Sequence, residues 1–426
     1  MVRRHSPALP IRLVLIFSFI LAGSLQSQSH QQDYDDVDPW LGFESPGPRA
    51  DSATTANFLK ALSLSQPVVC QFAVSSIGNH WGHWDDDDQI GILSDEESDK
   101  ASRQALSQSI TDSAALSLLA SSLGDQHPCV RRAAARLLGE SRAPESARLL
   151  RRALRNESSR VRESAALGLA HAEDPGAFRD LTAALGDKEP SVIRMAAYAL
   201  GELKDARGVK HLGDLLGSKN PGIRAAAAWG LGQIDDIRGV ERLRGLVRDN
   251  DPKVRRIVVD ALGEIEDYRA TGALSEALKD TDVRVRRAAA QALGQVEDHK
   301  SAGPLEKALD DPDPVVRRLA AQSLGALDGL KRAPPRLISA LGERDSELAI
   351  IAAKSLGEIG DTVVVPALAT AYGSENPRLR YSVVSALAEL EDERGDPVLT
   401  LASKDRDQIV RHKATEVLRD REDDHN

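Results

Sequence analysis

Apolar residues return with a fixed period along most of this chain. In the segment VRRAAAQALGQV, residues 285–296, they occupy the first, fifth, ninth and twelfth positions, which lie on one face of an α-helix. The pattern recurs every 31 residues, with a single step of 32. A constant period of this length indicates a stack of similar structural units. The residues that align with Val285 at the head of the pattern are Val130, Val161, Val192, Ile223, Val254, Val316, Leu348, Leu379 and Val410.

Each unit is predicted to hold two helices. An Asn or Asp three residues before the head position, such as Asn220 or Asp251, is a typical N-cap, because its side chain accepts a hydrogen bond from an unpaired backbone N–H. Pro follows in several units, as at Pro252, where its missing N–H has no cost. A turn that usually bears an Asp leads to a second helix with apolar residues such as Leu278. One helix pair cannot bury its apolar face alone, so neighbouring pairs must stack.

The consensus DPxVRxxAAxALGxI with this period resembles the HEAT-like repeats of the phycobilin-lyase type, over about residues 111–420. The resemblance implies an all-α fold, a right-handed α-solenoid of about eleven HEAT-like helix pairs. The segment QPVVCQFAVSSIGN, residues 66–79, fits the same template and indicates an earlier, degenerate unit. The fold by itself says little about function, because such arrays serve many ends.

The N-terminus has the pattern of a secretory signal peptide. Arg3, Arg4 and Arg12 supply positive charge, a short apolar run follows at 13–21, and small residues stand at 22–24. The run is too short to span a bilayer. Ser24 stands where a lipoprotein signal needs Cys. We therefore predict an extracytoplasmic protein, periplasmic or secreted, that has no membrane attachment after cleavage.

These features give an expected order of segments. We assign residues 1–24 to the signal peptide, 25–56 to a disordered acidic leader, and 57–124 to the degenerate first repeat, which carries an insertion at 79–108. Residues 125–421 form the regular array and 422–426 a polar tail. A polar tail covers the last layer and discourages end-to-end stacking, so we expect a monomer.

Acidic charge is concentrated near the N-terminus. The net charge is −10, from 65 acids against 55 Lys and Arg residues. Fourteen of the acids but four of the bases lie within residues 25–103, whereas the chain after residue 103 has 51 acids and 48 bases. An acidic chain without a basic tract argues against nucleic acid as a partner.

The insertion at 79–108 contains a partial cation-binding pattern. Four of its residues match positions 1, 3, 6 and 12 of an EF-hand-type calcium loop. Ile90 stands at position 5, where the loop needs an oxygen ligand, so a mobile acidic loop is the alternative. A transition-metal site at His80 and His83 is another alternative, and we predict no cofactor. The matching residues are Asp86, Asp88, Gly91 and Glu97.

The sequence holds two cysteines, Cys70 and Cys129. In an oxidising compartment they are able to form a disulfide. Two buried thiols within helices are the alternative interpretation.

An Arg follows the head residue in eight of ten units. The resemblance to HEAT-like arrays implies that this Arg pairs with an Asp of the neighbouring unit and ties the layers together. Such a pair is charge-assisted and partly buried, so it stabilises more than an exposed pair does. The eight residues are Arg131, Arg162, Arg224, Arg255, Arg286, Arg317, Arg380 and Arg411.

The positions two and six residues after the head flank the buried stripe, and we expect them on the concave face. Aromatic and Arg side chains gather there, and these residue types most often anchor protein interfaces. We predict a groove that binds another protein, in particular an acidic or carboxylate-bearing segment. The alternative is that Trp229 fills a gap beside small neighbours at 225–228, and a further one is that the acidic insertion folds back on this face. The groove residues are Arg194, Tyr198, Trp229, Arg256, Arg287 and Arg318.

Catalytic motifs are absent from the sequence, which has no G-x-S-x-G, H-E-x-x-H, Walker loop or C-x-x-C. Two enzymes share the repeat architecture. Deoxyhypusine hydroxylase holds iron with His-Glu pairs, and this sequence has no His-Glu dipeptide. We therefore predict a non-catalytic protein-interaction scaffold. The alternative is a bilin-lyase-like or small-ligand carrier activity on the same fold.

Overall fold

The structure is a computed structural model that describes residues 51–63, 110–141 and 143–424. The chain divides into two compact units, Met1–Gly47 and Pro48–Asn426, and every described residue belongs to the second. The predicted signal peptide, most of the acidic leader and the insertion at 79–108 lie outside the described residues. None of the described helices is both long enough and apolar enough to cross a membrane.

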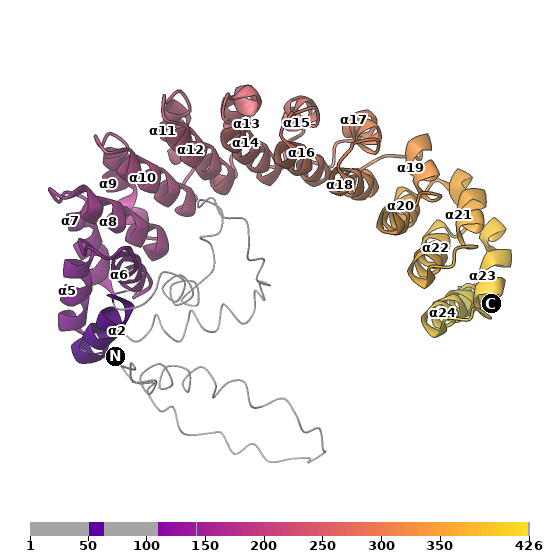
Figure 1. The fold of residues 1–426 in the computed structure, drawn as a ribbon, viewed down its shortest axis with the longest axis horizontal. Coiled ribbons are helices and arrows are strands. Elements are labelled where there is room, and N and C mark those ends of the chain that lie inside the picture. The colour runs from indigo at the N-terminus through magenta and orange to yellow at the C-terminus, as the bar shows by residue number, and fades with distance from the viewer. Residues whose placement is uncertain (1–50, 64–109, 142, 425–426) are drawn as a thin grey trace, which may run out of the picture. The chain divides into compact units, whose positions relative to one another are not determined.

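Within this unit the helices form two rows that follow an arc, and successive helices of the inner row pack side by side (Figure 1). This arrangement confirms the predicted α-solenoid. The inner helices are α6 (Pro128–Glu140), α8 (Ser159–Ala172), α10 (Pro190–Glu202), α12 (Pro221–Ile234), α14 (Pro252–Glu264), α16 (Val283–Gln295), α18 (Pro314–Gly325), α20 (Ser346–Ile359), α22 (Pro377–Leu390) and α24 (Gln408–Asp424).

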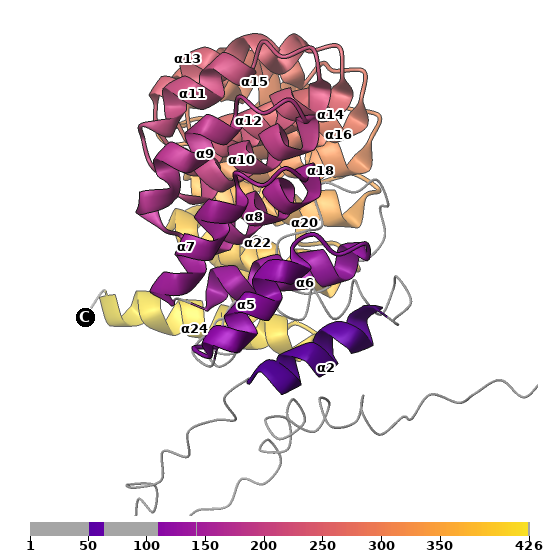
Figure 2. The same cartoon turned by 90° about the vertical axis from the view of Figure 1, so that its left-hand side faces the viewer.

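The outer row is made of shorter helices, several of which are preceded by a single 3-10 turn. At the N-terminal end, α2 packs against α5 and α6 (Figure 2). The outer helices are α5 (Ser113–Ser122), α7 (Pro144–Ala153), α9 (Phe178–Ala184), α11 (Gly208–Leu215), α13 (Arg238–Leu243), α15 (Thr271–Ala277), α17 (Ala302–Ala308), α19 (Pro335–Ala340), α21 (Val365–Ala371) and α23 (Asp396–Ala402), and the first described helix is α2 (Ser52–Ser63).

Two helix ends differ from the expected segment boundaries. Helix α2 begins at Ser52, before the expected start of the array at residue 57. Asp51 precedes this helix, and its backbone oxygen accepts from the amide and the hydroxyl of Thr55. Helix α24 continues to Asp424, beyond the expected end at residue 421, because the segment REDD contains no Gly or Pro that would stop it.

Caps of the predicted kind begin the inner helices. Asn220 accepts from the backbone N–H groups of Gly222 and Ile223 at the start of α12, and Asp251 accepts from that of Lys253 at the start of α14. These side chains satisfy donors that the first helical turn leaves unpaired.

Glycine residues allow the inner helices to approach closely. A Cβ atom at Gly294 of α16 would lie 2.5 Å from Oγ and 2.9 Å from Cβ of Ser323 on α18. The Ser323 hydroxyl donates to the backbone oxygen of Ala290 at 2.8 Å and so joins the two helices. The core between the rows consists mainly of Ala, Leu and Val, such as Val285 and Leu293, which are fully buried.

Candidate functional site

The inner face carries a stacked pair of aromatic rings, formed by Tyr198 of α10 and Trp229 of α12. The ring centroids are 4.5 Å apart and the ring planes differ by 19°. Trp229 lies over Gly201, where a Cβ atom would come within 2.9 Å of the indole Cζ3. The glycine therefore makes room for the ring, and the stack joins two consecutive layers.

The two rings differ in exposure. Tyr198 is 8% exposed, whereas Trp229 is half-buried and packs partly against the core. Burial, followed by the nearby carboxylate of Glu202, raises the pKa of the Tyr198 phenol well above its ordinary value. The phenol therefore stays neutral, and Trp229 presents the more accessible ring. The alternative interpretation, that Trp229 fills a gap, agrees with its contact with Gly201. It does not account for the part of the indole that remains exposed.

Two arginines lie on the inner helices that carry or adjoin this stack. Arg194 of α10 is exposed, its Cδ lies 3.0 Å from the position a Cβ would take at Gly222, and it forms no ion pair with a described residue. Arg256 of α14 pairs with Asp260 at 3.2 Å, with side chains that are 29% and 44% exposed. An ion pair so exposed is weak. We name Arg194, Tyr198, Trp229 and Arg256 the aromatic patch.

The other two arginines predicted for the groove bind aspartates that cap the next inner helix. Arg287 donates two hydrogen bonds to Asp313, at 2.9 and 2.7 Å, and Arg318 donates one to Asp345 at 2.8 Å. The hydrogen bond from Arg287 is the main cause that lowers the pKa of Asp313 to about 2. Both aspartates also accept from the first turns of α18 and α20. Arg287 and Arg318 therefore connect layers and are not part of the aromatic patch.

A second set of arginines forms paired contacts with aspartates 25 residues later in the chain, and we name this set the core ladder. Each aspartate lies in the turn before the next inner helix, and each guanidinium contacts it through Nε and Nη2. The Nε–Oδ2 distances are 2.6 Å for Arg162–Asp187, 2.7 Å for Arg224–Asp249, 2.6 Å for Arg255–Asp280, 2.8 Å for Arg286–Asp311 and 2.8 Å for Arg380–Asp405.

From Arg224 to Arg286 the core ladder is continuous, because each turn between these layers is bound twice. Arg224 binds the carboxylate of Asp249, and Arg255 donates through Nη1 to the backbone oxygen of the same Asp249 at 2.8 Å. Arg255 in turn binds the carboxylate of Asp280, whose backbone oxygen accepts from Arg286 at 3.0 Å. Each cation thus joins the turn before its own helix to the turn before the next one.

Three of the eight arginines that the sequence places at this position lack the full pair. Arg131 aligns with Asn156 instead of an aspartate and donates to backbone oxygens of the preceding turn. Arg317 aligns with Gly342, in the unit of 32 residues, and reaches the next carboxylate at 3.7 Å. Arg411 lies in the last inner helix and donates to backbone oxygens.

Two further units lack the arginine, and both also lack the aspartate. Ile193 and Ala349 occupy the arginine position, and Ser218 and Ser374 stand 25 residues later. The two serine hydroxyls accept from the backbone N–H two residues on, at 3.2 Å, as the ladder aspartates do. The turn keeps its local hydrogen bond where the ion pair is absent.

A second ladder, which the sequence reasoning missed, runs along the turns between inner and outer helices. In four turns an Arg binds the capping Asp two residues before it. In three of these the same Arg also donates to a backbone oxygen of the preceding turn, as Arg394 does to Thr362 at 2.9 Å. The signal in the sequence was a recurrent Asp-x-Arg. The four pairs are Asp205–Arg207, Asp236–Arg238, Asp267–Arg269 and Asp392–Arg394.

The remaining predicted sites fall mainly outside the structure's described ranges. Asp86, Asp88 and Glu97 of the predicted calcium loop lie there, as does Cys70. Cys129 in the first turn of α6 is buried and disulfide-bonded. Among the residues that are described, no group of three or more His, Cys, Asp or Glu side chains could hold a metal ion.

Comparisons with known proteins agree with this architecture. The family model described as HEAT repeats matches residues 90–170, 116–200, 178–251, 241–325 and 334–419. No curated protein matches the chain. These matched segments together cover well over half of the 426 residues.

The solved structures that match this chain share little sequence with it. A chain from the complex of Kap95p with RanGDP is 13% identical, with a TM-score of 0.51; the match covers 85% of this chain and 56% of that one. The complex of CpcE and CpcF of phycocyanin lyase from Nostoc is 24% identical over 57% of this chain and 94% of that chain, with a TM-score of 0.35. An engineered protein is 22% identical over 71% and 98%, with a TM-score of 0.48.

At such identities the similarity to the Kap95p complex shows the fold alone. The repeat matches and the stacked helix pairs together identify the family. This chain belongs to the HEAT repeat family.

Proposed function

We propose that this protein is a non-catalytic, extracytoplasmic scaffold that binds an acidic segment of another protein at the aromatic patch. HEAT repeats typically mediate protein interactions through the extended concave surface that stacking creates. The location rests on the signal-peptide pattern of residues 1–24. The absence of a catalytic motif in the sequence supports a binding role.

The single observation that carries the proposal is the Tyr198–Trp229 stack of α10 and α12, with Arg194 on α10 and Arg256 on the adjoining α14. Half-buried aromatic rings bind with little loss of conformational freedom, because they have few rotatable bonds and are already packed. Trp229 has this character, since one side of the indole rests on Gly201. The patch therefore offers a rigid apolar contact.

Arg194 and Arg256 determine which partner chemistry suits the patch. Arg194 pairs with no described carboxylate, and Asp260 is the one carboxylate among the described residues that pairs with Arg256. A guanidinium binds a carboxylate through two parallel hydrogen bonds. An acidic segment with an apolar or aromatic side chain would contact both kinds of surface.

The test compares capture of partners by wild type and variants after cross-linking in the native extracytoplasmic fraction. The variants are Trp229→Ala and the double change Arg194→Glu with Arg256→Glu. A matched control carries Arg332→Glu with Arg344→Glu, which alters charge equally at two exposed arginines elsewhere. We expect the captured protein to be lost from both patch variants and kept by the control, while circular dichroism stays unchanged.

The captured protein is then identified, and a synthetic peptide of its acidic segment is tested for direct binding by fluorescence anisotropy. If patch variants and control bind that peptide equally, the aromatic patch is not the binding site. A purified protein that carries a bound chromophore, and captures no protein, would favour the small-ligand carrier instead.

A further inference from the structure

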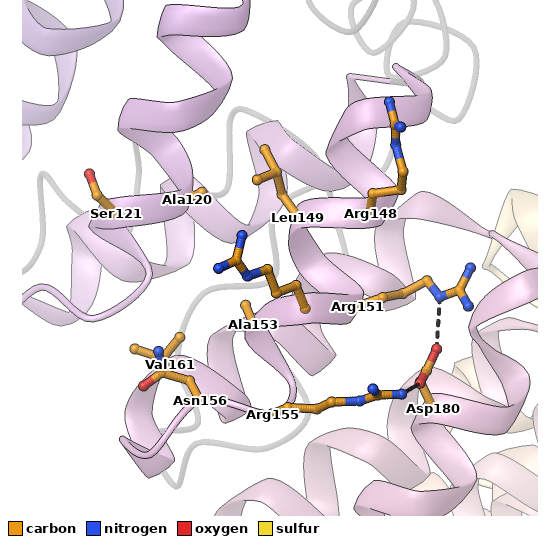
Figure 3. A pocket seen from close by; sticks show the side chains of 11 residues that line it. Ala120, Ser121, Arg148, Leu149, Arg151, Ala153, Arg155, Asn156, Val161 and Asp180 are labelled. Atoms are coloured by element: carbon orange, nitrogen blue, oxygen red, sulfur yellow. Dashed lines mark hydrogen bonds and ion pairs between the residues drawn. The ribbon is translucent and has the colours of Figure 1, made fainter.

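Helices α5, α7 and α9 of the outer row surround an open pocket of about 800 Å³ (Figure 3). It lies among outer helices, whereas the aromatic patch lies on inner ones. The floor is partly apolar and includes Leu149 of α7 and Val161 of α8. A volume of this size exceeds that of a simple ion and suits a few side chains of a peptide.

Four arginines of the α7 region line the pocket: Arg148, Arg151, Arg152 and Arg155. Arg151 and Arg155 converge on Asp180 of α9, at 2.7 and 2.9 Å (Figure 3). Among the described residues no carboxylate pairs with Arg148 or Arg152. Four arginines against one aspartate leave the lining with a formal charge of +3 on a protein whose net charge is −10.

Asn156, which also lines the pocket, explains part of this excess. It stands at the core-ladder position where five other layers have an aspartate bound to arginine. Its amide still accepts from the backbone N–H of Ser158 at 2.9 Å, so the turn is formed as in those layers. The substitution removes a negative charge at this pocket without changing the local backbone bond.

Two arginines further along the outer row, at the end of α13 and directly after it, provide a contrast. Arg242 pairs with Asp214, and Arg244 with Glu241 at 3.0 Å. Each of these two cations has a carboxylate partner, whereas Arg148 and Arg152 have none among the described residues. The chain as a whole is acidic, which argues against a nucleic acid strand as the ligand.

We propose that this pocket binds an acidic peptide segment of a partner protein, one that also carries an apolar side chain, at a second site separate from the aromatic patch. The guanidinium groups of Arg148 and Arg152 bind the carboxylates, and an apolar side chain packs on Leu149 and Val161. Arg151 and Arg155 remain bound to Asp180 and hold α7 against α9. Two acid-binding sites on opposite rows allow one array to hold two partner segments together.

The test uses full-length protein and a fluorescein-labelled synthetic peptide of Asp, Glu and Leu residues, followed by anisotropy. The pocket variant is Arg148→Glu with Arg152→Glu, and the matched control is Arg332→Glu with Arg344→Glu. We expect the pocket variant to bind about tenfold more weakly and the control to stay within about twofold of wild type. Because no described ion pair is broken, both variants should keep the wild-type helical signal.

The variant Asn156→Asp distinguishes a loss of peptide binding from a loss of folding. It returns a carboxylate to the pocket, so peptide binding should weaken several-fold while the urea midpoint does not fall. The aromatic-patch variant with Arg194→Glu and Arg256→Glu should bind the peptide through the pocket with at most about a twofold loss.

Three results would overturn the proposal. The first is equal binding by the pocket variant and wild type. The second is equal binding of a peptide in which Asn and Gln replace Asp and Glu. The third is displacement of the peptide by inorganic phosphate or an oligothymidine at concentrations where the unlabelled peptide fails to displace it, which would assign the pocket to another anion. Loss of the peptide from the aromatic-patch variant alone would place this binding on the inner face and leave the proposed function intact.

Discussion

Arg255 of α14 binds the carboxylate of Asp280, which precedes the next inner helix, through Nε–Oδ2 and Nη2–Oδ1 contacts of 2.6 and 2.8 Å. Its third nitrogen donates to the backbone oxygen of Asp249 at 2.8 Å. The side chains of Arg255 and Asp280 are 14% and 8% exposed, so water competes little for either. One guanidinium thus fixes the spacing of two successive layers.

Loss of this cation should destabilise the array strongly. Arg255→Ala leaves the Asp280 carboxylate buried without its partner, which costs about 2–4 kcal/mol in comparable cases. The free energy of unfolding is measured by urea titration of the helical signal. The control is Arg269→Ala, whose partner Asp267 is in the same turn and whose side chain is 34% exposed; we expect a much smaller loss, because water screens an exposed ion pair. Equal losses of unfolding free energy in the two variants would show that a core-ladder pair stabilises the array no more than an exposed pair does.

Asn156→Asp should raise the free energy of unfolding, in contrast to Arg255→Ala. It places a carboxylate 25 residues after Arg131, at the distance in sequence that separates every complete pair of the core ladder. A new charge-assisted bond should raise the free energy of unfolding by about 0.5–1.5 kcal/mol. Ser374→Asp is the matched control, because Ala349 stands at the arginine position of that unit, and it should give no gain. A gain of equal size at residue 374 would mean that the hydrogen bond within the turn, and not the ion pair, is responsible.

The ladder position could be predicted from sequence because it depends on a period that survives in every unit. Its exceptions depend on which residue lies 25 positions later, and the sequence alone did not identify that position as the partner of the arginine. Asn156 and Gly342 break the pair at that point, although Arg131 and Arg317 satisfy the consensus. The Asp-x-Arg turns are visible in the sequence, but an Asp at a turn is typical of a helix cap, so the motif alone does not indicate an ion pair.

Acid should weaken the contact between α16 and α18. Arg287 holds the pKa of Asp313 at about 2, below its ordinary 3.8. A carboxylate with a lowered folded-state pKa contributes stability above its unfolded value, and this contribution is lost as the pH falls through the folded value. The free energy of unfolding should therefore fall between about pH 4 and pH 2.

Asp313→Asn isolates this contribution. The amide keeps the N-cap bond but not the ion pair, so the variant should lose less stability over that pH interval than wild type, by about 1 kcal/mol after solvent screening. Urea titrations at several pH values measure the difference. Parallel pH profiles for the two proteins would exclude Asp313 as a contributor.

Two glycine substitutions should change stability in opposite directions. In Gly294→Ala the added Cβ atom would lie 2.5 Å from Oγ of Ser323. This overlap should lower the free energy of unfolding by about 1–3 kcal/mol. Gly272 lies in α15 with nothing within 4 Å of its Cβ position. Gly272→Ala should therefore raise stability by about 0.5–1 kcal/mol, because alanine favours helix. Thermal unfolding followed by circular dichroism measures both changes in stability. If both variants were less stable than wild type, the close contact between helices would not be the cause of the loss at Gly294.

The proposed site was only partly predictable. Helical spacing brought Tyr198 and Trp229 to one face of consecutive helices, and the structure places their rings 4.5 Å apart. The burial of Tyr198 could not be read from spacing, because it depends on what packs around the ring. Arg287 and Arg318 share the spacing of Arg194, but an aspartate caps each following helix and binds them. Asn220 takes the corresponding place after Arg194, so no carboxylate is available there.

Site-specific photocross-linking tests partner binding at the aromatic patch most directly. A photoreactive amino acid is placed at Arg194 in one protein and at Gln322, an exposed residue of α18 on the same row, in another. After illumination in extracts of the native cells and of their medium, covalent products are identified by mass spectrometry. We expect one partner protein to be attached at position 194 through an acidic segment, and to be absent or much reduced at position 322. No product at 194 in a protein with the wild-type helical signal, or the same products at both positions, would contradict binding at the aromatic patch.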